Sequence, residues 1–268
     1  MLTKPFALAA CTAIATLTGT SALAAEPFAW PEGKKAAVVL TYDDSMPSHL
    51  DIAIPALDAA GIKGTFFLNG TFANESVERW RATAESGHEL GNHSVFHPCR
   101  AGSFEMPEQY HLENYSVATM LNELRVMNNL LTALDGKAMH TYATPCGNTL
   151  AGGEDFIAPI MEAGFAPAIR GVAAPEHDPN KIELNAVPSE WFPEDASGKD
   201  MIRAVKAVEK EGGLLVIGFH GVGADYLTVP AASHKELADY LGAHTDEIWV
   251  APFGEVMAWV ATHQSEAD

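Results

Sequence analysis

The chain has 268 residues, of which 47% are hydrophobic, and its formal net charge at pH 7 is −19. This length and apolar content suffice for one sizeable core, and a barrel of alternating strands and helices is commonly a single domain of this size. The acidic balance argues against nucleic acids and anionic polymers as partners, because like charges repel, and is compatible with a neutral substrate.

The first two dozen residues are predicted to be a signal peptide (residues 1–24). Lys4 is followed by an apolar stretch, and Ala22-Leu23-Ala24 offers the small residues that a signal peptidase reads. We expect cleavage near residues 24–25, export to the periplasm or the medium, and a catalytic domain over residues 25–268. An N-terminal membrane anchor or a lipoprotein signal at Cys11 are the alternatives, although the apolar run is short for either. No other segment is expected to span a membrane.

The rest of the chain alternates short apolar runs with longer helical patterns that often end at glycine. Strands are predicted at Ala36–Thr41, Gly64–Leu68, His88–Asn92, Met139–Thr144, Phe165–Ile169, Leu214–Phe219 and Glu247–Ala251. Helices are predicted at His49–Ala60, Glu75–Ser86, Ser116–Leu134, Glu154–Ala163, Lys199–Glu211, Ser233–Leu241 and Glu255–Thr262. This alternation predicts an α/β fold with a mainly parallel sheet, open or closed into a barrel.

Side chains capable of chemistry follow these strands. In parallel α/β folds the carboxyl ends of the strands share one face, and the active site lies there. We therefore expect one site to contain Asp43, Asp44, His93, His97, Cys146, Arg170 and His220.

Two segments carry the most specific signal, Thr41-Tyr42-Asp43-Asp44 and His93-Ser94-Val95-Phe96-His97. Adjacent carboxylates at the end of a buried strand repel each other unless a cation neutralises them. Two imidazoles and one carboxylate can hold a divalent metal, zinc or else cobalt or nickel, and leave one position open for water. The second carboxylate is then available as a base, which indicates a metal-dependent hydrolase. Taken alone, the two segments could also be an exposed turn and a polar loop.

His220 ends the most apolar strand, where an imidazole can donate a proton to a leaving group or be an ordinary core histidine. The following Gly221-x-Gly223 lacks the third glycine of a nucleotide-binding loop, so no nucleotide cofactor is expected. Cys99 and Cys146 remain once Cys11 leaves with the signal. In an oxidising compartment they can form one disulfide that ties the two site segments together, the alternative being two buried thiols.

These segments resemble those of the polysaccharide deacetylases, carbohydrate esterase family 4, which share the NodB-homology fold, a distorted (β/α) barrel. The resemblance covers about residues 36–255. Thr41-Tyr42-Asp43-Asp44 is similar to the family's Thr-Phe-Asp-Asp segment, which implies that Asp43 is the catalytic base and Asp44 a metal ligand. His93-Ser94-x-x-His97 is similar to the segment that supplies the other two ligands, and Leu214–His220 resembles the strand that delivers the catalytic acid, His220.

The third family segment, Arg-x-Pro-x-Gly, reads Ala143-Thr144-Pro145-Cys146-Gly147 here, so the arginine that orients the base is missing. We expect Arg170 to replace it in space, rather than Arg100, because Arg170 follows a strand. The backbone N–H of Cys146 can still supply the family's oxyanion contact.

The fourth family segment is only suggested by Glu190-Trp191. Glu190 and Asp225 are therefore both candidates for the acid that supports His220. Trp191 and Tyr42 are expected to line the substrate groove or else to be ordinary core residues.

The resemblance implies an exported metal-dependent polysaccharide deacetylase, a hydrolase acting on carbon–nitrogen bonds other than peptide bonds. Its substrate would be an acetylated glycan such as chitin oligomers or peptidoglycan. The alternatives are an O-acetyl esterase acting on xylan, an enzyme that hydrolyses a small cyclic amide, and a non-catalytic metal- or glycan-binding protein of the same fold. The sequence leaves the oligomeric state open.

Overall fold

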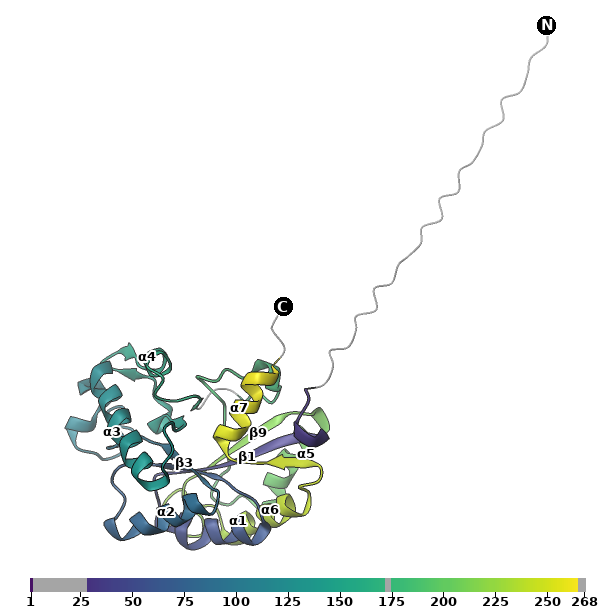
Figure 1. Cartoon of the computed structure of the whole chain (residues 1–268), viewed down its shortest axis with the longest axis horizontal. Helices are drawn as coiled ribbons and strands as arrows, with labels where there is room; N and C mark the ends of the chain where they lie inside the picture. Colours follow the sequence, from purple (N-terminus) through teal and green to yellow (C-terminus); the bar gives the residue numbers. More distant parts are fainter. Residues whose placement is uncertain (2–27, 172–174, 265–268) are drawn as a thin grey trace.

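A curled sheet of parallel strands organises the molecule in the computed structural model, which describes residues 28–171 and 175–264 together with Met1 (Figure 1). The strand order is β7-β4-β3-β2-β1-β9-β8, with β10 also beside β1. The strands are β1 Ala36–Asp43, β2 Thr65–Leu68, β3 Glu89–Asn92, β4 Tyr142–Ala143, β7 Ile169–Arg170, β8 Glu190–Trp191, β9 Leu214–Phe219 and β10 Ile248–Val250. The predicted signal peptide lies almost entirely outside the described residues.

The two edges of this sheet are connected through the segment that precedes β8. Ile169 and Gly171 donate backbone hydrogen bonds to Leu184 (2.7 Å) and Val187 (2.9 Å), and β8 then pairs with β9. The sheet therefore curls into the distorted (β/α) barrel that the resemblance implied. The carboxyl ends of its parallel strands lie around the same rim.

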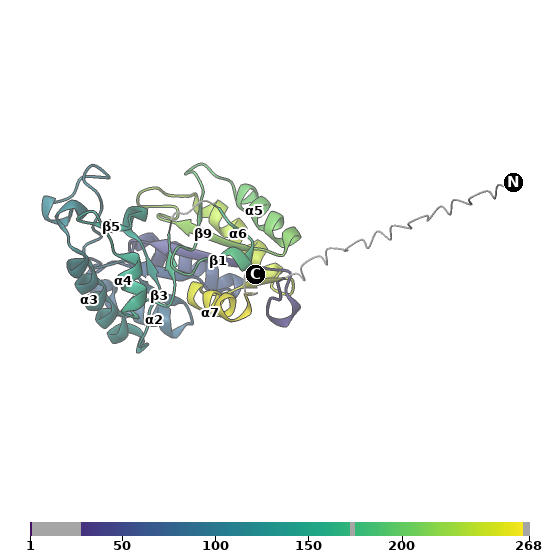
Figure 2. The same cartoon turned by 90° about the horizontal axis from the view of Figure 1, so that it is seen from above.

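Helices surround the sheet. They are α1 Ile54–Ala60, which continues a π-helical turn at His49–Ala53, α2 Val77–Glu85, α3 Val117–Asp135, α4 Ile157–Glu162, α5 Gly198–Glu211, α6 Ala231–Ala243 and α7 Phe253–His263. Seen from above, α3, α4 and the small hairpin of β5 (Leu150–Ala151) and β6 (Glu154–Asp155) lie at one end of the sheet, and α5 and α6 lie at the other (Figure 2). Among the described residues no helix is long and apolar enough to cross a membrane.

The core is divided by β1, whose eight residues are all buried. Val38, Leu40 and Tyr42 pack in the cluster that contains α1, α5 and α6, whereas Ala37 and Val39 pack in the cluster that contains α7. Because side chains alternate along a strand, Asp43 follows the face of Ala37 and Val39 and Tyr42 the opposite one. This alternation determines which residues of β1 can reach the site.

Local sequence signals account for the ends of several helices. Ser116 caps α3 by accepting a hydrogen bond from the N–H of Thr119, and Gly136 ends the helix in the left-handed conformation (φ 74°). Ser197 and Asp200 form a reciprocal capping box at the start of α5. Such caps satisfy backbone groups that the first and last turns of a helix leave unpaired.

Most of the predicted elements are present, and the differences occur next to the site. The prediction of a helix over Glu154–Ala163 is wrong at its start, because Glu154–Asp155 pairs with Leu150–Ala151 before α4 begins. The strands predicted at Met139–Thr144 and Phe165–Ile169 are each reduced to a two-residue strand. The strand β8 was not predicted, since two residues carry no detectable periodicity.

Candidate metal centre

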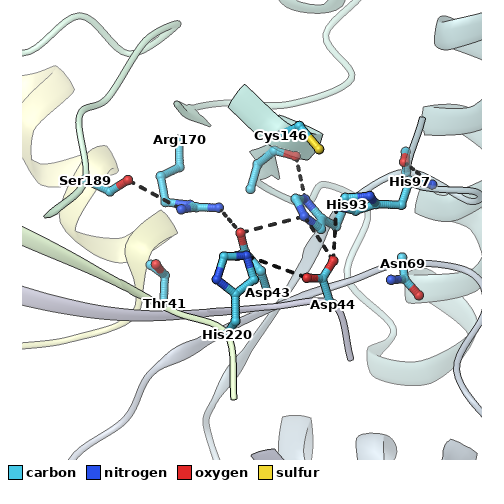
Figure 3. A network of polar contacts seen from close by, with 12 residues as sticks. Thr41, Asp43, Asp44, Asn69, His93, His97, Cys146, Arg170, Ser189 and His220 are labelled. Atoms are coloured by element: carbon cyan, nitrogen blue, oxygen red, sulfur yellow. Dashed lines mark hydrogen bonds and ion pairs between the residues drawn. The ribbon is translucent and has the colours of Figure 1, made fainter. Parts of the chain in front are cut away.

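The two aspartates at the end of β1 both reach the site because the chain turns abruptly after Asp43. Asp44 and Ser45 have φ values of 76° and 57°, in the left-handed region that residues other than glycine rarely adopt. The turn keeps the side chain of Asp44 on the same side as that of Asp43, instead of on the opposite face as in a continuing strand. Figure 3 shows both carboxylates directed into the site.

Three side chains form a set with the geometry of a metal site. Oδ1 of Asp44 lies 3.5 Å from Nε2 of His93 and 3.1 Å from Nε2 of His97. In a tetrahedral zinc site with bonds of roughly 2.1 Å, ligand atoms are about 3.4 Å apart, so the set fits such an ion. Asp44, His93 and His97 were the ligands implied by the resemblance.

The electrostatics of this set also suit a cation. Burial lowers the pKa of His93 to about 4, which leaves a neutral imidazole. Burial alone would raise the pKa of Asp44, but its hydrogen bond with His97 and the charges of His93 and His97 hold that pKa well below its usual range. His93 is therefore a neutral imidazole and Asp44 an ionised carboxylate at neutral pH. Burial would lower the pKa of His97, but its hydrogen bond with Asp44 and the charge of that carboxylate raise it, so a cation would have to displace a proton at His97.

The first imidazole of the set is oriented by the neighbouring strand. Nδ1 of His93 donates a hydrogen bond to the carbonyl oxygen of Ala143 at 2.8 Å, because a carbonyl can only accept. The other nitrogen, Nε2, is then the unprotonated one, and it faces Asp44. Fixing the tautomer of a histidine in this way is the usual means of presenting it to a metal.

A buried glutamate that the sequence analysis missed holds the loop between the two histidines. Oε2 of Glu123, on α3, accepts hydrogen bonds from the backbone N–H groups of Val95 (3.1 Å) and Phe96 (3.0 Å), and its Oε1 accepts one from the hydroxyl of Tyr115. Ser94 and His97 in this loop have φ values of 64° and 51°. Glu123 therefore stabilises a loop conformation that is intrinsically unfavourable.

The other carboxylate, Asp43, is paired with Arg170. Nη2 of Arg170 donates to Oδ2 of Asp43, and the guanidinium lies 5.1 Å from the ring centre of Phe67 and 5.0 Å from that of Trp191. Arg170 is in register with Ala143 across β4 and β7, so it occupies the strand next to the position where the family segment has its arginine. Oδ1 of Asp43 is buried and has no hydrogen-bond partner among the described residues.

His220 follows β9 and faces the same site. Its Nε2 lies 3.8 Å from Oδ2 of Asp44, too far for a hydrogen bond, and its ring centre lies 4.7 Å from that of Trp191. Neither candidate for a supporting acid contacts it. Glu190 is hydrogen-bonded to Nε2 of His177 (2.6 Å), and Asp225 accepts from the N–H of Ser48 (2.9 Å).

The expected disulfide between Cys99 and Cys146 is confirmed, with Cα atoms 5.9 Å apart. It joins the segment that follows His97 to the turn after β4. In that turn the hydrogen bonds run from Gly147 N to Thr144 O and from Asn148 N to Pro145 O, and neither uses the N–H of Cys146. Cys146 has a φ of 52° and lines the pocket.

These residues line one cavity of about 630 Å³, to which Trp191, Phe104, Tyr226 and Leu227 also contribute. The prediction that Trp191 lines the site is confirmed. For Tyr42 the alternative of a core residue holds, because its side chain is fully buried on the opposite face of β1 and hydrogen-bonds to Nε2 of His234 (2.7 Å). Arg100 is not among the residues that line the cavity, whereas Arg170 is.

The family model for polysaccharide deacetylases matches residues 31–156, which include Asp43, Asp44, His93 and His97. This part of the chain is therefore similar to the polysaccharide deacetylases. The chain spans only a small part of the length of the curated relatives that it matches. An uncharacterized protein of Bacillus subtilis, YlxY, is 40% identical over 50 residues, which are 19% of this chain and 16% of YlxY. A gellan lyase from a Bacillus species is 23% identical over 257 residues, 88% of this chain and 10% of the lyase.

Solved structures extend the likeness in fold over most of the chain. A crystal structure from Mycobacterium smegmatis, described as that of a polysaccharide deacetylase, matches with a TM-score of 0.61 at 20% sequence identity. The match covers 91% of this chain and 98% of that chain. PuuE allantoinase gives 0.63 at 16% identity, with 90% and 95% covered. A mutant of BA3943, a family 4 pseudoenzyme, gives 0.53 at 18% identity, with 84% and 67% covered. The same fold therefore occurs with different activities, and the function has to be argued from the site.

The buried carboxylate of Glu123 can be tested by the change Glu123→Gln. An amide oxygen accepts hydrogen bonds more weakly than a carboxylate, and the amide N–H₂ would face the backbone donors of Val95 or the hydroxyl of Tyr115. We expect zinc affinity, measured by competition with a chromophoric chelator, to fall by about 10-fold or more, as for other partners that orient metal ligands. Glu85→Gln, an exposed change on α2, is the control. Equal affinity in both variants would show that Glu123 does not position the ligand loop.

Proposed function

We propose that this protein is an exported, metal-dependent hydrolase that removes acetyl groups from the N-acetylated sugars of a polysaccharide or oligosaccharide. The observation that carries the proposal is the unequal pairing of two neighbouring carboxylates. Asp44 is directed to the two imidazoles, and Asp43 is held by Arg170 with Oδ1 unpartnered. One carboxylate is thereby suited to bind a cation and the other to accept a proton.

The residues of the site divide the steps of hydrolysis among them. A divalent ion held by Asp44, His93 and His97, most simply zinc, would polarise the acyl carbonyl and lower the pKa of a water molecule. Asp43 accepts the proton of the attacking water. The N–H of Cys146 donates to the oxygen that becomes negative, and His220 donates a proton to the departing amine.

The walls of the pocket and the charge of the chain favour a neutral glycan. Trp191, Phe104 and Tyr226 present aromatic rings to the cavity, and such rings pack against the apolar faces of sugars. A chain with a net charge of −19 attracts polyanions poorly. Chitin oligomers and the glycan of peptidoglycan are the two substrates that we propose to test first.

Export is part of the proposal. It is supported by the predicted signal peptide over residues 1–24 and by the disulfide between Cys99 and Cys146, since disulfides persist mainly in oxidising compartments. The non-catalytic alternative was prompted by the arginine missing at position 143. The contact between Arg170 and Asp43 argues against that alternative, because a guanidinium is present at the base after all.

Acetate release from a panel of substrates tests the proposal. Chitooligosaccharides, peptidoglycan fragments and acetylxylan are each incubated with metal-stripped protein and with protein reloaded with zinc, cobalt or nickel. We expect metal-dependent release from an N-acetylated glycan. Release from acetylxylan alone would assign an O-acetyl esterase instead. Tight glycan binding without release from any substrate would assign a non-catalytic protein.

Because Asp43 and Asp44 are assigned different roles, two matched variants should lose different properties, one catalysis and the other zinc binding. Asp43→Asn should keep zinc bound and lower kcat by about 100-fold or more, because the amide cannot accept the proton. Asp44→Asn should lose zinc at concentrations that saturate the wild type. Zinc content and acetate release are measured on the same samples. A fully active Asp43→Asn variant would disprove the assignment of the base.

The register between β4 and β7 predicts that the arginine can be moved between strands. Arg170→Ala should lower the free energy of unfolding by about 3 kcal/mol and abolish most activity, because Asp43 is left buried without its partner. The double variant Arg170→Ala/Ala143→Arg should recover part of both, since residues in register on neighbouring strands are only about 5 Å apart and point to the same face. Urea unfolding and acetate release measure the recovery. No recovery of either quantity would mean that Arg170 does more than pair with Asp43.

A further inference from the structure

A tyrosine outside every motif contacts the candidate metal ligand Asp44. The hydroxyl of Tyr226 donates a hydrogen bond to Oδ2 of Asp44 at 2.5 Å, because an ionised carboxylate can only accept. We propose that Tyr226 is a positioning residue that restricts Asp44 to binding the metal through Oδ1 alone. The proposal rests on the metal-dependent function proposed above and assigns a specific role to one more residue of the same site.

The two oxygens of Asp44 face different partners. Oδ1 is the atom near Nε2 of His93 and His97, and Oδ2 is the atom that Tyr226 contacts. A carboxylate without such a partner can bind a metal through both oxygens, which would take up one of the positions needed for water and the acyl oxygen. A hydrogen bond on Oδ2 competes with that second metal bond. Tyr226 therefore favours the arrangement that leaves those positions open.

The loop that carries Tyr226, residues 221–229, is held by its own backbone. Gly221 donates to the carbonyl oxygen of Tyr226 at 3.1 Å, and Gly223 donates to that of Val229 at 2.8 Å. The residues on either side of Tyr226, Asp225 and Leu227, have φ values of 69° and 46°. Two unfavourable backbone conformations next to one side chain are expected where the direction of that side chain is important.

The same loop is attached to the segment that follows β1. The N–H of Ser48 donates to Oδ2 of Asp225 at 2.9 Å, and the hydroxyl oxygen of Ser48 accepts from the N–H of Val222 at 3.2 Å. His49 donates through Nε2 to the carbonyl oxygen of His220 at 2.8 Å. Asp44 and Tyr226 thus belong to two segments that are joined by three further hydrogen bonds, so their contact does not depend on a freely moving loop.

A purely structural role explains Tyr226 poorly. Its side chain is exposed, with 55% of its surface accessible, and it belongs to none of the hydrophobic clusters. Its ring centre lies 5.8 Å from that of His220, at the wall of the pocket. Removal of the hydroxyl would leave no internal cavity, so its loss should affect the metal centre and not the stability of the fold.

The test is Tyr226→Phe in the full chain loaded with cobalt, whose visible absorption weakens strongly when its coordination number rises from four to six. We expect the variant to absorb more weakly than the wild type, because Oδ2 of Asp44 becomes free to bind. We also expect kcat on the best substrate of the panel to fall by about 10–100-fold with little change in KM, and the melting temperature to stay the same. The matched control is Tyr240→Phe on α6, where the same hydroxyl is removed away from the pocket.

The outcomes separate this inference from the proposed function. Wild-type protein that binds cobalt and releases acetate, with a Tyr226→Phe variant identical in spectrum and kcat, overturns the role of Tyr226 and leaves the proposed function intact. A spectrum changed in Tyr226→Phe but not in Tyr240→Phe supports it. Wild-type protein that binds no cobalt overturns both, because the ligand set itself would then be wrong.

Discussion

The repulsion between two adjacent carboxylates is the constraint on which the site depends. Asp43 and Asp44 end a strand whose residues are all buried, and two charges so close together are stable only if each has its own partner. Arg170 is the partner of Asp43, and the imidazoles of His93 and His97, with any ion that they hold, are the partners of Asp44. The left-handed turn at Asp44 makes this division possible, because it directs two consecutive side chains to different partners on the same side.

The parallel sheet explains why the partner of Asp43 can come from a different strand than the family segment suggests. Ala143 and Arg170 are in register on β4 and β7, and residues in register on neighbouring strands present their side chains to the same face. The guanidinium from β7 therefore reaches the carboxylate that an arginine on β4 would otherwise reach. The guanidinium lies over the rings of both Phe67 and Trp191, which limits its movement. A guanidinium is therefore present beside Asp43, although the arginine that carries it is on β7 and not at position 143 on β4.

The sequence was sufficient for the parts of the site that lie at strand ends. The strand and helix pattern placed Asp43, His93, Arg170 and His220 at one edge of the sheet. The positions of the two cysteines beside the motifs allowed a disulfide but left two free thiols as the alternative, and the structure shows the disulfide. The choice between groove and core was left open for Tyr42 because the alternation of side chains along β1 was not applied to it. Its neighbour Asp43 faces the site, so Tyr42 has to face the helices.

The residues that the sequence did not reveal act across long separations. Glu123 is on α3, yet it accepts hydrogen bonds from the loop of His93 and His97, and the one available signal was a glutamate on the apolar face of an amphipathic helix. Tyr226 is 182 residues from Asp44, in a loop without periodicity. Such contacts follow from how loops fold back onto the site, and local propensity carries no information about that.

The backbone of the site is strained at many points, and buried polar contacts hold it in place. Asp44, Ser94, His97, Cys146, Asp225 and Leu227 all have positive φ values, and all of them lie in or beside the pocket. Three of the strained segments have an anchor: Glu123 for the ligand loop, the disulfide for Cys146, and Ser48 for Asp225. Glu123 and Ser48 lie outside the family segments, so an exchange of either can alter the geometry of the site while every motif residue stays the same.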